Sequence, residues 1–259
     1  MSDNFTPLSR ERLRIIRSLA SRKIRRRKGL CLVEGQRAIE ESAKSGYLEY
    51  LVAEDPTVLA GMEIVQAGAA AQIPVFSADS ALFEDASDVV HHRNLLGVAK
   101  LPADPGISQL LKIDGPAVLL FLDGVQDPGN VGALIRTAWA LGGMGILVGK
   151  GSADPFGPKA IRASAGGIFH LPVFKEIVRE DLMLLAEAGF CVYLADARGR
   201  PFDEVTFNSR SILAVGNEGC GLSPWIGELG MPVSVPLRGE ADSLNAVVAG
   251  SILLWAMLS

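Results

Sequence analysis

Residues 117–141 read AVLLFLDGVQDPGNVGALIRTAWAL, and this stretch decides the class of fold. Residues 117–122 form a continuous apolar run, which predicts a strand buried in a parallel sheet. Residues 129–141 have the pattern of a helix. A buried strand that passes through a short turn into a helix is the repeating unit of an α/β fold. Because ligands bind such folds at the carboxyl ends of the strands, the turn after residue 122 is the first candidate for a functional site.

The same alternation continues on both sides of this stretch. Towards the C-terminus we predict strands at 145–148, 191–195, 211–216 and 232–237 and helices at 159–164, 178–188 and 243–258. Towards the N-terminus we predict a basic helix or arm at 5–28, strands at 30–34, 50–53, 73–77 and 95–99, and helices at 36–45, 57–72 and 80–85. The fold class is therefore α/β in two units, the second with a mostly parallel sheet.

The boundary between the two units is predicted in the segment KLPADPGISQLLKIDGP, residues 100–116. This segment holds three prolines and two glycines around one short apolar patch, a composition that is typical of a linker. The predicted organisation is a first domain over residues 1–100, a linker over 101–116 and a second domain over 117–259.

The overall composition, 49% hydrophobic and 21% charged residues, is that of a globular protein with a sizeable core. Cys31, Cys191 and Cys220 lie far apart, so we predict small core side chains in a reducing cytoplasm rather than disulfides or a zinc site. The N-terminus lacks the pattern of a secretory signal. The longest apolar run, residues 246–258, is shorter than the ~20 residues of a membrane helix, so we predict a helix buried in a core or a subunit interface.

Charge is distributed unevenly along the chain. Within residues 1–30, ten basic residues are opposed only by Asp3 and Glu11, so this segment carries +8 and the remainder carries −12. Such polarity predicts a polyanion-binding element on an acidic body. The alternative is a solvated charged helix. The four adjacent cations at residues 25–28, RRRK, gain more from phosphate groups than from pairing, which favours contact with RNA.

Three loops at predicted strand ends carry glycines and small polar residues: DGVQDPGNVGALIR at 123–136, GNEGCGLSP at 216–224 and RGEADSLN at 238–245. Glycine lets the backbone approach a ligand closely, and each loop is predicted to enter a helix, where backbone N–H groups lack partners. The second loop alone is typical of any turn that begins a helix, and the phosphate-binding pattern GxxxxGK[ST] is absent from the sequence.

Four sequence blocks taken together are far more specific. They are DPGNVGALIRTAWALG (127–142), KAIRASAGGIFHLPV (159–173), LAVGNEGCGLS (213–223) and VPLRGEADSLNAVVAGSILLW (235–255). In this order they resemble the SpoU-type (TrmH-like) RNA ribose 2′-O-methyltransferases of the SPOUT, or trefoil-knot, superfamily.

The first unit resembles that family's small L30e-like domain, which binds the RNA substrate. The matching residues are the basic run, Gly29, Val33, Glu34, Gly35, Arg37 and the strand near 96–99. Arg93 and Asn94 depart from the family, which often has Pro-Gln at these positions.

This resemblance implies a C-terminal trefoil-knot domain, a homodimer formed through that domain, S-adenosyl-L-methionine as cofactor and RNA as partner, with no metal and no membrane. The cofactor-binding residues that it implies are Gly216, Asn217, Glu218, Gly219, Val235, Pro236, Leu237, Ser243 and Leu244. The catalytic residues that it implies are Asn130, Arg136, Glu218, Ser243 and Asn245. The basic run and the resemblance together predict RNA contacts by Arg22, Lys23, Arg25, Arg26, Arg27, Lys28, Arg37 and Arg162.

Each catalytic candidate also has a structural interpretation. Asn130 and Ser243 stand where helix N-caps are expected, and Glu218 could be a carboxylate at a helix start or a partner of Arg136. The family places Arg136 beside the ribose hydroxyl, sometimes as general base. The ordinary pKa of an arginine lies far above neutral pH, so lowering it into the neutral range would cost roughly 9 kcal/mol. An arginine that holds the phosphate and stabilises the forming alkoxide as a cation avoids this free-energy cost.

Several functional alternatives remain open from the sequence. Ribosomal RNA is the preferred substrate because a separate L30e-like domain suits structured RNA, and transfer RNA is the alternative. A non-catalytic RNA-binding protein with the same fold is disfavoured by the presence of all five catalytic candidates, and methylation of a base nitrogen fits the motifs less well. His91, His92 and His170 form no recognisable hydrolase triad or metal cluster.

Overall fold

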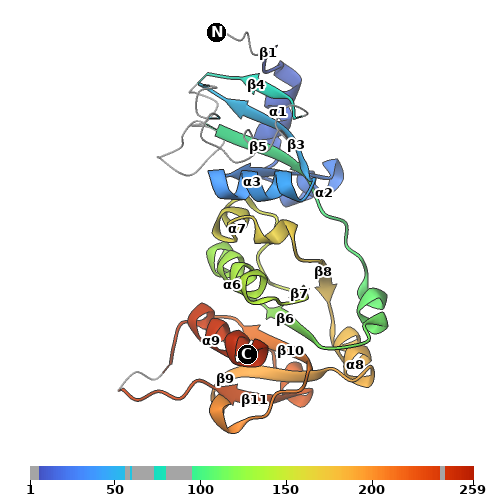
Figure 1. The fold of residues 1–259 in the computed structure, drawn as a ribbon, viewed down its shortest axis with the longest axis vertical. Helices are drawn as coiled ribbons and strands as arrows, with labels where there is room; N and C mark the ends of the chain where they lie inside the picture. The colour runs from blue at the N-terminus through green and yellow to red at the C-terminus, as the bar shows by residue number, and fades with distance from the viewer. Residues whose placement is uncertain (1–5, 56–58, 60–72, 80–94, 240–242) are drawn as a thin grey trace. The chain divides into compact units, whose positions relative to one another are not determined.

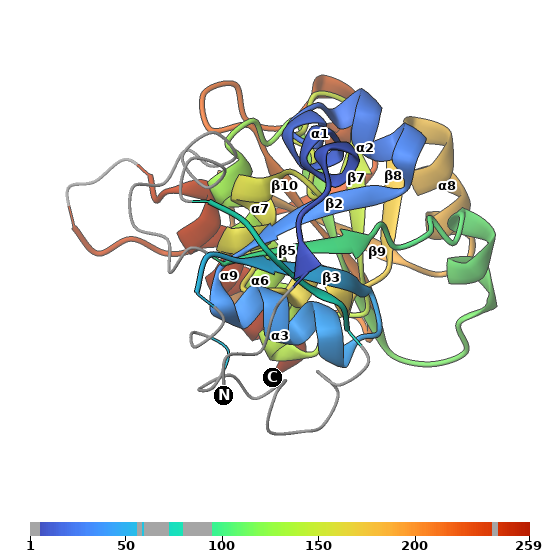
Figure 2. The ribbon, with the colours of Figure 1, turned by 90° about the horizontal axis from the view of Figure 1, so that it is seen from above.

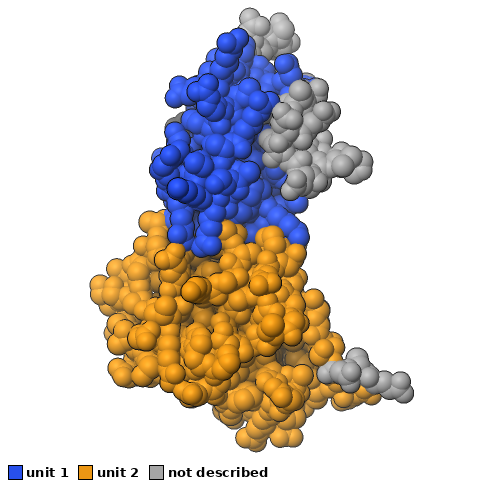
Figure 3. Space-filling view, turned by 180° about the vertical axis from the view of Figure 1, so that it is seen from behind, with its two compact units in different colours: residues 1–102, 156–169 blue, residues 103–155, 170–259 orange. Residues whose placement is uncertain are grey.

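The computed structural model describes residues 6–55, 59, 73–79, 95–239 and 243–259. The chain divides into two compact units, coloured separately in Figure 3. Unit 1 contains residues 1–102 and 156–169, and unit 2 contains residues 103–155 and 170–259. The predicted helices at 57–72 and 80–85 and the residues His91 to Asn94 lie outside the described residues, apart from Leu59, which is buried.

Unit 1 is built on a mixed five-stranded sheet in the order β1-β4-β3-β5-β2. Its strands are β1 (Thr6–Pro7), β2 (Leu30–Glu34), β3 (Leu48–Ala53), β4 (Val75–Ser77) and β5 (Leu95–Lys100), and its helices are α1 (Arg10–Ser18), α2 (Arg22–Lys28), α3 (Gln36–Lys44), α7 (Pro158–Ala163) and the 3-10 turn η4 (Gly167–Phe169). β5 pairs antiparallel with both β2 and β3, whereas β4 pairs parallel with β1 and β3. The predicted strands of the first unit are confirmed.

The basic N-terminal segment forms two helices. Ser9 caps α1 by accepting a hydrogen bond from the backbone N–H of Arg12 at 3.3 Å, and α2 ends at Gly29, whose φ of 66° is the left-handed conformation that glycine adopts easily. Ile16 of α1 and Leu19, which follows the helix as its C-cap, pack against Leu32 and Val98 of the sheet. Helix α3 packs on β2 and β5 as well, and Figure 2 separates α1 from α3 across these strands.

Unit 2 is built on a six-stranded sheet in the order β11-β9-β10-β6-β7-β8, in which every pair is parallel. Its strands are β6 (Ala117–Asp123), β7 (Gly145–Gly149), β8 (Val173–Ile177), β9 (Cys191–Pro201), β10 (Arg210–Gly216) and β11 (Gly230–Ser234), and its helices are α6 (Pro128–Leu141), α8 (Arg179–Glu187) and α9 (Ala246–Leu258), with 3-10 turns η3 (Ile107–Lys112), η5 (Phe202–Glu204) and η6 (Pro224–Glu228) (Figure 1). The prediction of an α/β fold with a mostly parallel sheet is confirmed.

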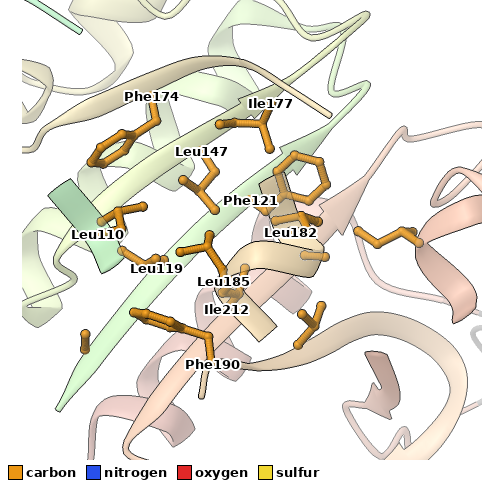
Figure 4. Close-up of a cluster of buried hydrophobic side chains, with 14 of the residues drawn as sticks. Leu110, Leu119, Phe121, Leu147, Phe174, Ile177, Leu182, Leu185, Phe190 and Ile212 are labelled. Carbon is orange, nitrogen blue, oxygen red and sulfur yellow. The ribbon is translucent and has the colours of Figure 1, made fainter. Parts of the chain in front are cut away.

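Two helical layers cover this sheet. On one face, Leu182 and Leu185 of α8 pack with Leu110, Phe190 and the strand residues of a large apolar cluster, shown in Figure 4. On the other, α6 and α9 pack together and α9 contacts β10. A side chain at Gly250 of α9 would come within about 3.0 Å of Leu134 and Val215, so this glycine lets the helix approach closely.

Several elements of unit 2 differ from the predictions, among them β9, which extends to Pro201 rather than to residue 195. Strand β8 was not predicted, because Lys175 and Glu176 interrupt its apolar pattern. Strand β11 covers 230–234 rather than 232–237. Helix α9 begins at Ala246 rather than at residue 243, since Asn245 supplies the cap by accepting a hydrogen bond from the backbone N–H of Val247 at 2.9 Å.

Candidate functional site

A cavity of about 610 Å³ lies at the carboxyl edge of the unit 2 sheet. Its walls are the ends of β9, β10 and β11 and the loops that follow them, together with the start of α9. The volume falls within the range of ~300–1,000 Å³ typical of sites for small molecules and cofactors. The parallel arrangement brings these strand ends together, as expected for a ligand site in an open α/β sheet.

Asn217 organises the loop that follows β10. Its side-chain oxygen accepts hydrogen bonds from the backbone N–H groups of Gly219 at 2.8 Å and Cys220 at 2.9 Å. Its side-chain nitrogen donates to the carbonyl of Gly124, after β6, at 3.0 Å. The backbones of Asn217 and Gly221 also bond to each other in both directions at 2.9 Å. One side chain therefore shapes this loop and ties it to the neighbouring strand end.

Glycine is required at two positions where backbone segments near the cavity pass very close to each other. A Cβ at Gly216 would lie 2.5 Å from the carbonyl carbon of Gly221, and a Cβ at Gly199 would lie 2.5 Å from the backbone of Pro232 and Val233. Both neighbours are backbone atoms that cannot rotate away. Gly199 in β9 and Gly216 in β10 thus allow the loop after β10 and strand β11 to pack against adjacent backbone.

Asp123, the last residue of β6, is a buried anchor behind the cavity. Its carboxylate accepts hydrogen bonds from the backbone N–H of Ser223 at 2.6 Å and from the Ser223 hydroxyl at 3.0 Å. Next to it, the Ser152 hydroxyl donates to the carbonyl of Leu122 at 2.9 Å and accepts from the N–H of Gly124 at 3.0 Å. The buried polar groups at these strand ends satisfy one another, which fixes the loops in place.

Glu218 is held at the start of α6. The side-chain nitrogen of Asn130 donates to the Glu218 carboxylate at 2.7 Å. Partial burial alone would raise the pKa of Glu218, but hydrogen bonds from the Asn130 side chain and from backbone amides, including those of Gln126 and Asp127, outweigh it and hold the pKa below its usual range. Glu218 is therefore an ionised carboxylate at a helix N-terminus, although the helix belongs to a different segment.

The cap of α6 is Asp127, not Asn130. The Asp127 carboxylate accepts a hydrogen bond from the backbone N–H of Asn130 at 3.0 Å, so the interpretation of Asn130 as an N-cap is wrong. Its side chain is free of that role and reaches Glu218 instead. Arg136 lies two turns further along α6 and is exposed. The side chain that bonds to Glu218 is that of Asn130 rather than that of Arg136.

The cavity brings together most of the residues predicted to bind a cofactor. Those that line it are Gly216, Asn217, Glu218, Val235, Leu237, Ser243 and Leu244, together with the catalytic candidate Asn245. Gly219 and Pro236 stand beside lining residues without lining the cavity themselves. Asn130 and Arg136 are outside the lining, but the Asn130–Glu218 hydrogen bond joins α6 to its wall.

Sequence reasoning missed the second half of β9, which forms another wall. Asp196 and Arg198 line the cavity there, and the Asp196 carboxylate accepts a hydrogen bond from the backbone N–H of Arg198 at 2.9 Å. This hydrogen bond and the nearby guanidinium hold the pKa of Asp196 below its usual range. The sequence CVYLADARG shows an apolar strand that ends in Asp and Gly, the signal that was used at the other strand ends. Cys220 also lines the cavity and is exposed, so its prediction as a core residue is wrong.

The residues predicted to bind RNA divide into two groups. The exposed group on α2 consists of Arg22, Lys23, Arg26, Arg27 and Lys28. Arg25, in contrast, is 4% exposed, and its guanidinium donates hydrogen bonds to the carbonyls of Leu19 and Ala20, both at 2.8 Å. The prediction that Arg25 contacts RNA is therefore replaced by a structural role at the end of α1.

Arg37 and Arg162 are both paired within unit 1. Arg37 forms an ion pair with Glu41 at 3.1 Å and keeps an exposed side chain. Arg162 of α7 forms an ion pair with Glu34 of β2, whose side chain is only 2% exposed. Removing one partner of a buried pair leaves the other uncompensated, so this ion pair holds α7 on β2. The RNA contact of Arg162 stays a prediction.

No group of three or more potential metal ligands is found in the described part of the chain. Among the described helices, none combines the length and apolar character needed to cross a bilayer. Fold and site together define a two-unit α/β protein. Its parallel sheet carries a glycine-walled cavity that is lined by carboxylates, and its smaller unit exposes a basic helix.

Comparisons with known proteins match both units. Residues 117–255 match the model of the SpoU rRNA methylase family, and residues 10–97 match the MRM3-like substrate binding domain. The 23S rRNA (guanosine(2553)-2′-O)-methyltransferase RlmP of Bacillus subtilis is 31% identical over 92% of each chain. The chain belongs to the SpoU rRNA methylase family, as the resemblance of its motifs predicted.

Solved structures agree with this assignment. The SpoU methyltransferase AviRb from Streptomyces viridochromogenes, in complex with the cofactor AdoMet, has a TM-score of 0.81 and 26% identity and matches 95% of this chain and 97% of its own. An RNA methyltransferase of the TrmH family from Porphyromonas gingivalis has a TM-score of 0.78 and 30% identity, with 96% and 98% of the two chains covered. These matches extend over both units.

Proposed function

We propose that this chain transfers a methyl group from S-adenosylmethionine to a ribose 2′-hydroxyl of 23S ribosomal RNA. The single observation that carries the proposal is the cavity of unit 2, in which the loops after β10 and β11 meet beside a carboxylate tied to α6. Similarity to RlmP over 92% of the chain supports ribosomal RNA as the substrate and favours it over transfer RNA.

The residues of the cavity fit S-adenosylmethionine. This cofactor is a compact cation with an adenosine and a charged tail, and it supplies a methyl group bound to a sulfonium. The carboxylates of Asp196 and Glu218 complement the positive charge. Gly216, Gly221 and Gly227 line the cavity with backbone alone, so adenosine can lie against peptide groups. Leu237 and Leu244 provide apolar surface and exclude water.

The chain's main contribution to the reaction is positioning. Holding two reactants in attack geometry can supply ~7–11 kcal/mol. We assign the cofactor to the cavity and the target nucleotide to the neighbouring surface of α6, with Ser243 and Asn245 between them at the start of α9. Glu218, already ionised and hydrogen-bonded, holds Asn130 and thereby fixes the start of α6 relative to the cavity wall.

Arg136 is assigned to the phosphate of the target nucleotide and to the alkoxide that forms on its ribose. Its side chain is exposed on α6, and its fork of N–H donors suits two oxygens at once. In this role it acts as a cation that lowers the energy of the developing negative charge, and the hydroxyl proton passes to solvent water at this exposed surface of α6.

Unit 1 is assigned to substrate binding. The exposed cations of α2 provide a surface for the phosphate backbone, and each such contact adds affinity that depends on salt concentration. The organisation proposed is an RNA-binding domain over residues 1–100, a linker over 101–116 and a methyltransferase domain over 117–259. A ribosomal RNA substrate also supports a cytoplasmic location, which is part of the proposal.

Membership of the family supports two further proposals, a trefoil knot at the C-terminus and a homodimer formed through the knot domain. Helix α9 reads AVVAGSILLWAML and is apolar on almost every side. A helix of this kind is normally buried all round, yet Val248 and Trp255 are 46% and 56% exposed in the single chain. We propose that a second copy covers them. Replacing Trp255 with glutamate should then yield monomers in analytical ultracentrifugation.

The central experiment has two stages. Calorimetry with S-adenosylmethionine tests the cavity, and transfer of a labelled methyl group to in-vitro-transcribed 23S rRNA, with a tRNA transcript in parallel, tests the reaction. Reverse transcription at low nucleotide concentration then maps the methylated ribose. Absence of cofactor binding would leave a plain RNA-binding protein, and label in a base rather than a ribose would exclude 2′-O-methylation.

A further inference from the structure

Trp139 and His170 form a stacked pair outside the machinery described above. The indole and imidazole ring centroids are 4.6 Å apart, and the ring planes differ by 10°. Trp139 belongs to α6 and is partly buried, whereas His170 precedes β8 and is exposed. Two flat rings are therefore held in a face-to-face stack with one member at the surface of unit 2.

The stack lies on a different side of α6 from the α9 contact. Thr137 faces α9, because its hydroxyl is 3.0 Å from that of Ser251. Residues two apart in a helix are separated by about 200°, so Trp139 points away from α9. Arg136 is three residues before Trp139, and residues at this spacing are neighbours on a helix surface. The exposed guanidinium and the stacked rings therefore share one side of the helix.

We propose that the Trp139–His170 pair is a stacking platform for an unpaired RNA base next to the methylated nucleotide, an inference that rests on the proposed function. Unpaired bases are commonly recognised by stacking on aromatic rings and histidine. Trp139 lies only about 5 Å along α6 from Arg136, at 1.5 Å per residue, so a base on the rings is adjacent to the phosphate that Arg136 holds. The platform thus takes a flanking base and Arg136 the phosphate beside it.

This arrangement predicts selectivity for a loop. A base can lie on the imidazole only if it has left its own helical stack, so a fully paired RNA would place a phosphate on Arg136 without using the rings. Stacking has little dependence on base identity. The platform therefore selects an unpaired flanking nucleotide and raises affinity for RNA, and it leaves the cofactor cavity unchanged.

The test compares His170→Ala, His170→Phe and the surface control Met183→Ala, which alters an exposed side chain of α8. Methyl transfer to in-vitro-transcribed 23S rRNA gives KM and kcat, and calorimetry gives the Kd for S-adenosylmethionine. His170→Ala should raise KM for RNA about tenfold, with kcat, cofactor Kd and Tm near wild type. His170→Phe should restore KM, because a flat ring returns without the ring nitrogens.

Several results would overturn the platform. A wild-type KM in His170→Ala shows that RNA does not use the rings. A raised KM in both variants shows that the imidazole acts through its nitrogens rather than by stacking. A fall in Tm in His170→Ala that accounts for its loss of activity assigns the stack to stability. If wild-type protein methylates no RNA, the proposed function fails, and filter binding of the same transcript by the variants still decides the platform.

Discussion

The cavity of unit 2 and the basic surface of α2 use polar side chains in opposite ways. Around the cavity, Asn217, Asp123 and Glu218 are bound to other parts of the chain before any ligand arrives. On α2, the cations are exposed, and Arg25 alone of the predicted set is buried. The difference teaches that single substitutions at the cavity should have large and specific effects, whereas those on α2 should be small, additive and dependent on salt.

The largest effect is expected for Arg136. Its side chain is exposed, like the cations of α2, yet it lies on the helix that the Asn130–Glu218 hydrogen bond ties to the cavity wall. Arg136→Lys keeps a cation but loses the fork of donors. We expect kcat for methyl transfer to fall about 100-fold or more, as when a group that stabilises a developing oxyanion is removed. Calorimetry should show unchanged binding of S-adenosylmethionine. Turnover like that of the wild type in Arg136→Lys would exclude the two-oxygen role.

Asn217 tests whether the cavity is organised before the cofactor binds. Asn217→Ala removes two hydrogen bonds within the loop and one to Gly124, each with a net value of about 1 kcal/mol. We expect binding of S-adenosylmethionine, measured by calorimetry, to weaken about tenfold to a hundredfold. Asn217→Asp is the matched variant because it retains the two accepted hydrogen bonds. Its affinity for S-adenosylmethionine should lie between those of the wild type and Asn217→Ala. Equal affinity in all three proteins would show that the loop forms around the ligand.

Much of the fold could be predicted because apolar runs such as those of β2, β6 and β10 coincide with buried strands. In unit 2 the exception is β8, which occupies an edge of the sheet. Edge strands carry charge on their open side, and this strand also bulges at Glu176, whose φ is 59°. The alternation of apolar and polar residues in β8 is therefore interrupted both by charged residues and by the bulge. The boundaries of β11 and α9 shifted for local reasons, the latter because Asn245 rather than Ser243 caps the helix.

The loops that form the candidate site could be predicted from the sequence, but the hydrogen bonds between their side chains could not. The loops after β6, β10 and β11 were identified because strand ends of a parallel sheet share an edge. The observed partner of Glu218 could not be found. The sequence suggested Arg136, whereas the side chain of Asn130 forms the bond because Asp127 caps α6 in its place. The burial of Arg25 was hidden for a similar reason, because its partners are backbone carbonyls that no sequence pattern marks.

A smaller effect is expected from the pH dependence of Glu218. Its pKa is held below the usual value in the folded chain, so its ionised form adds stability above the ordinary glutamate pKa of about 4.3, and this stability is lost as pH falls through the lowered value. The difference in Tm between wild type and Glu218→Gln should be constant near neutral pH and shrink in acid. Asn130→Ala should shrink it as well, because one cause of the lowered pKa is removed.

The same comparison predicts that Glu218 does not shape the pH dependence of methyl transfer near neutral pH. A carboxylate that stays ionised throughout the neutral range cannot shape a pH profile there. The dependence of kcat on pH between about 6 and 9 should therefore have the same form in wild type and Glu218→Gln, whatever its height. A limb that disappears in the variant would show that Glu218 titrates during the reaction.

The smallest effect on RNA binding is expected from the cations of α2, where Arg27 and Arg25 form a matched pair. Arg27→Ala should weaken binding to the 23S transcript slightly and reduce the slope of log K against log salt by about 0.7–0.9, with no change in Tm. Arg25→Ala removes the same charge but also two hydrogen bonds to the end of α1. It should lower the stability of unit 1 by about 2 kcal/mol, measured by urea unfolding, and leave the salt slope near wild type. If both variants changed the slope equally, charge alone would matter on this surface, and the distinction between bound and exposed arginines would be lost.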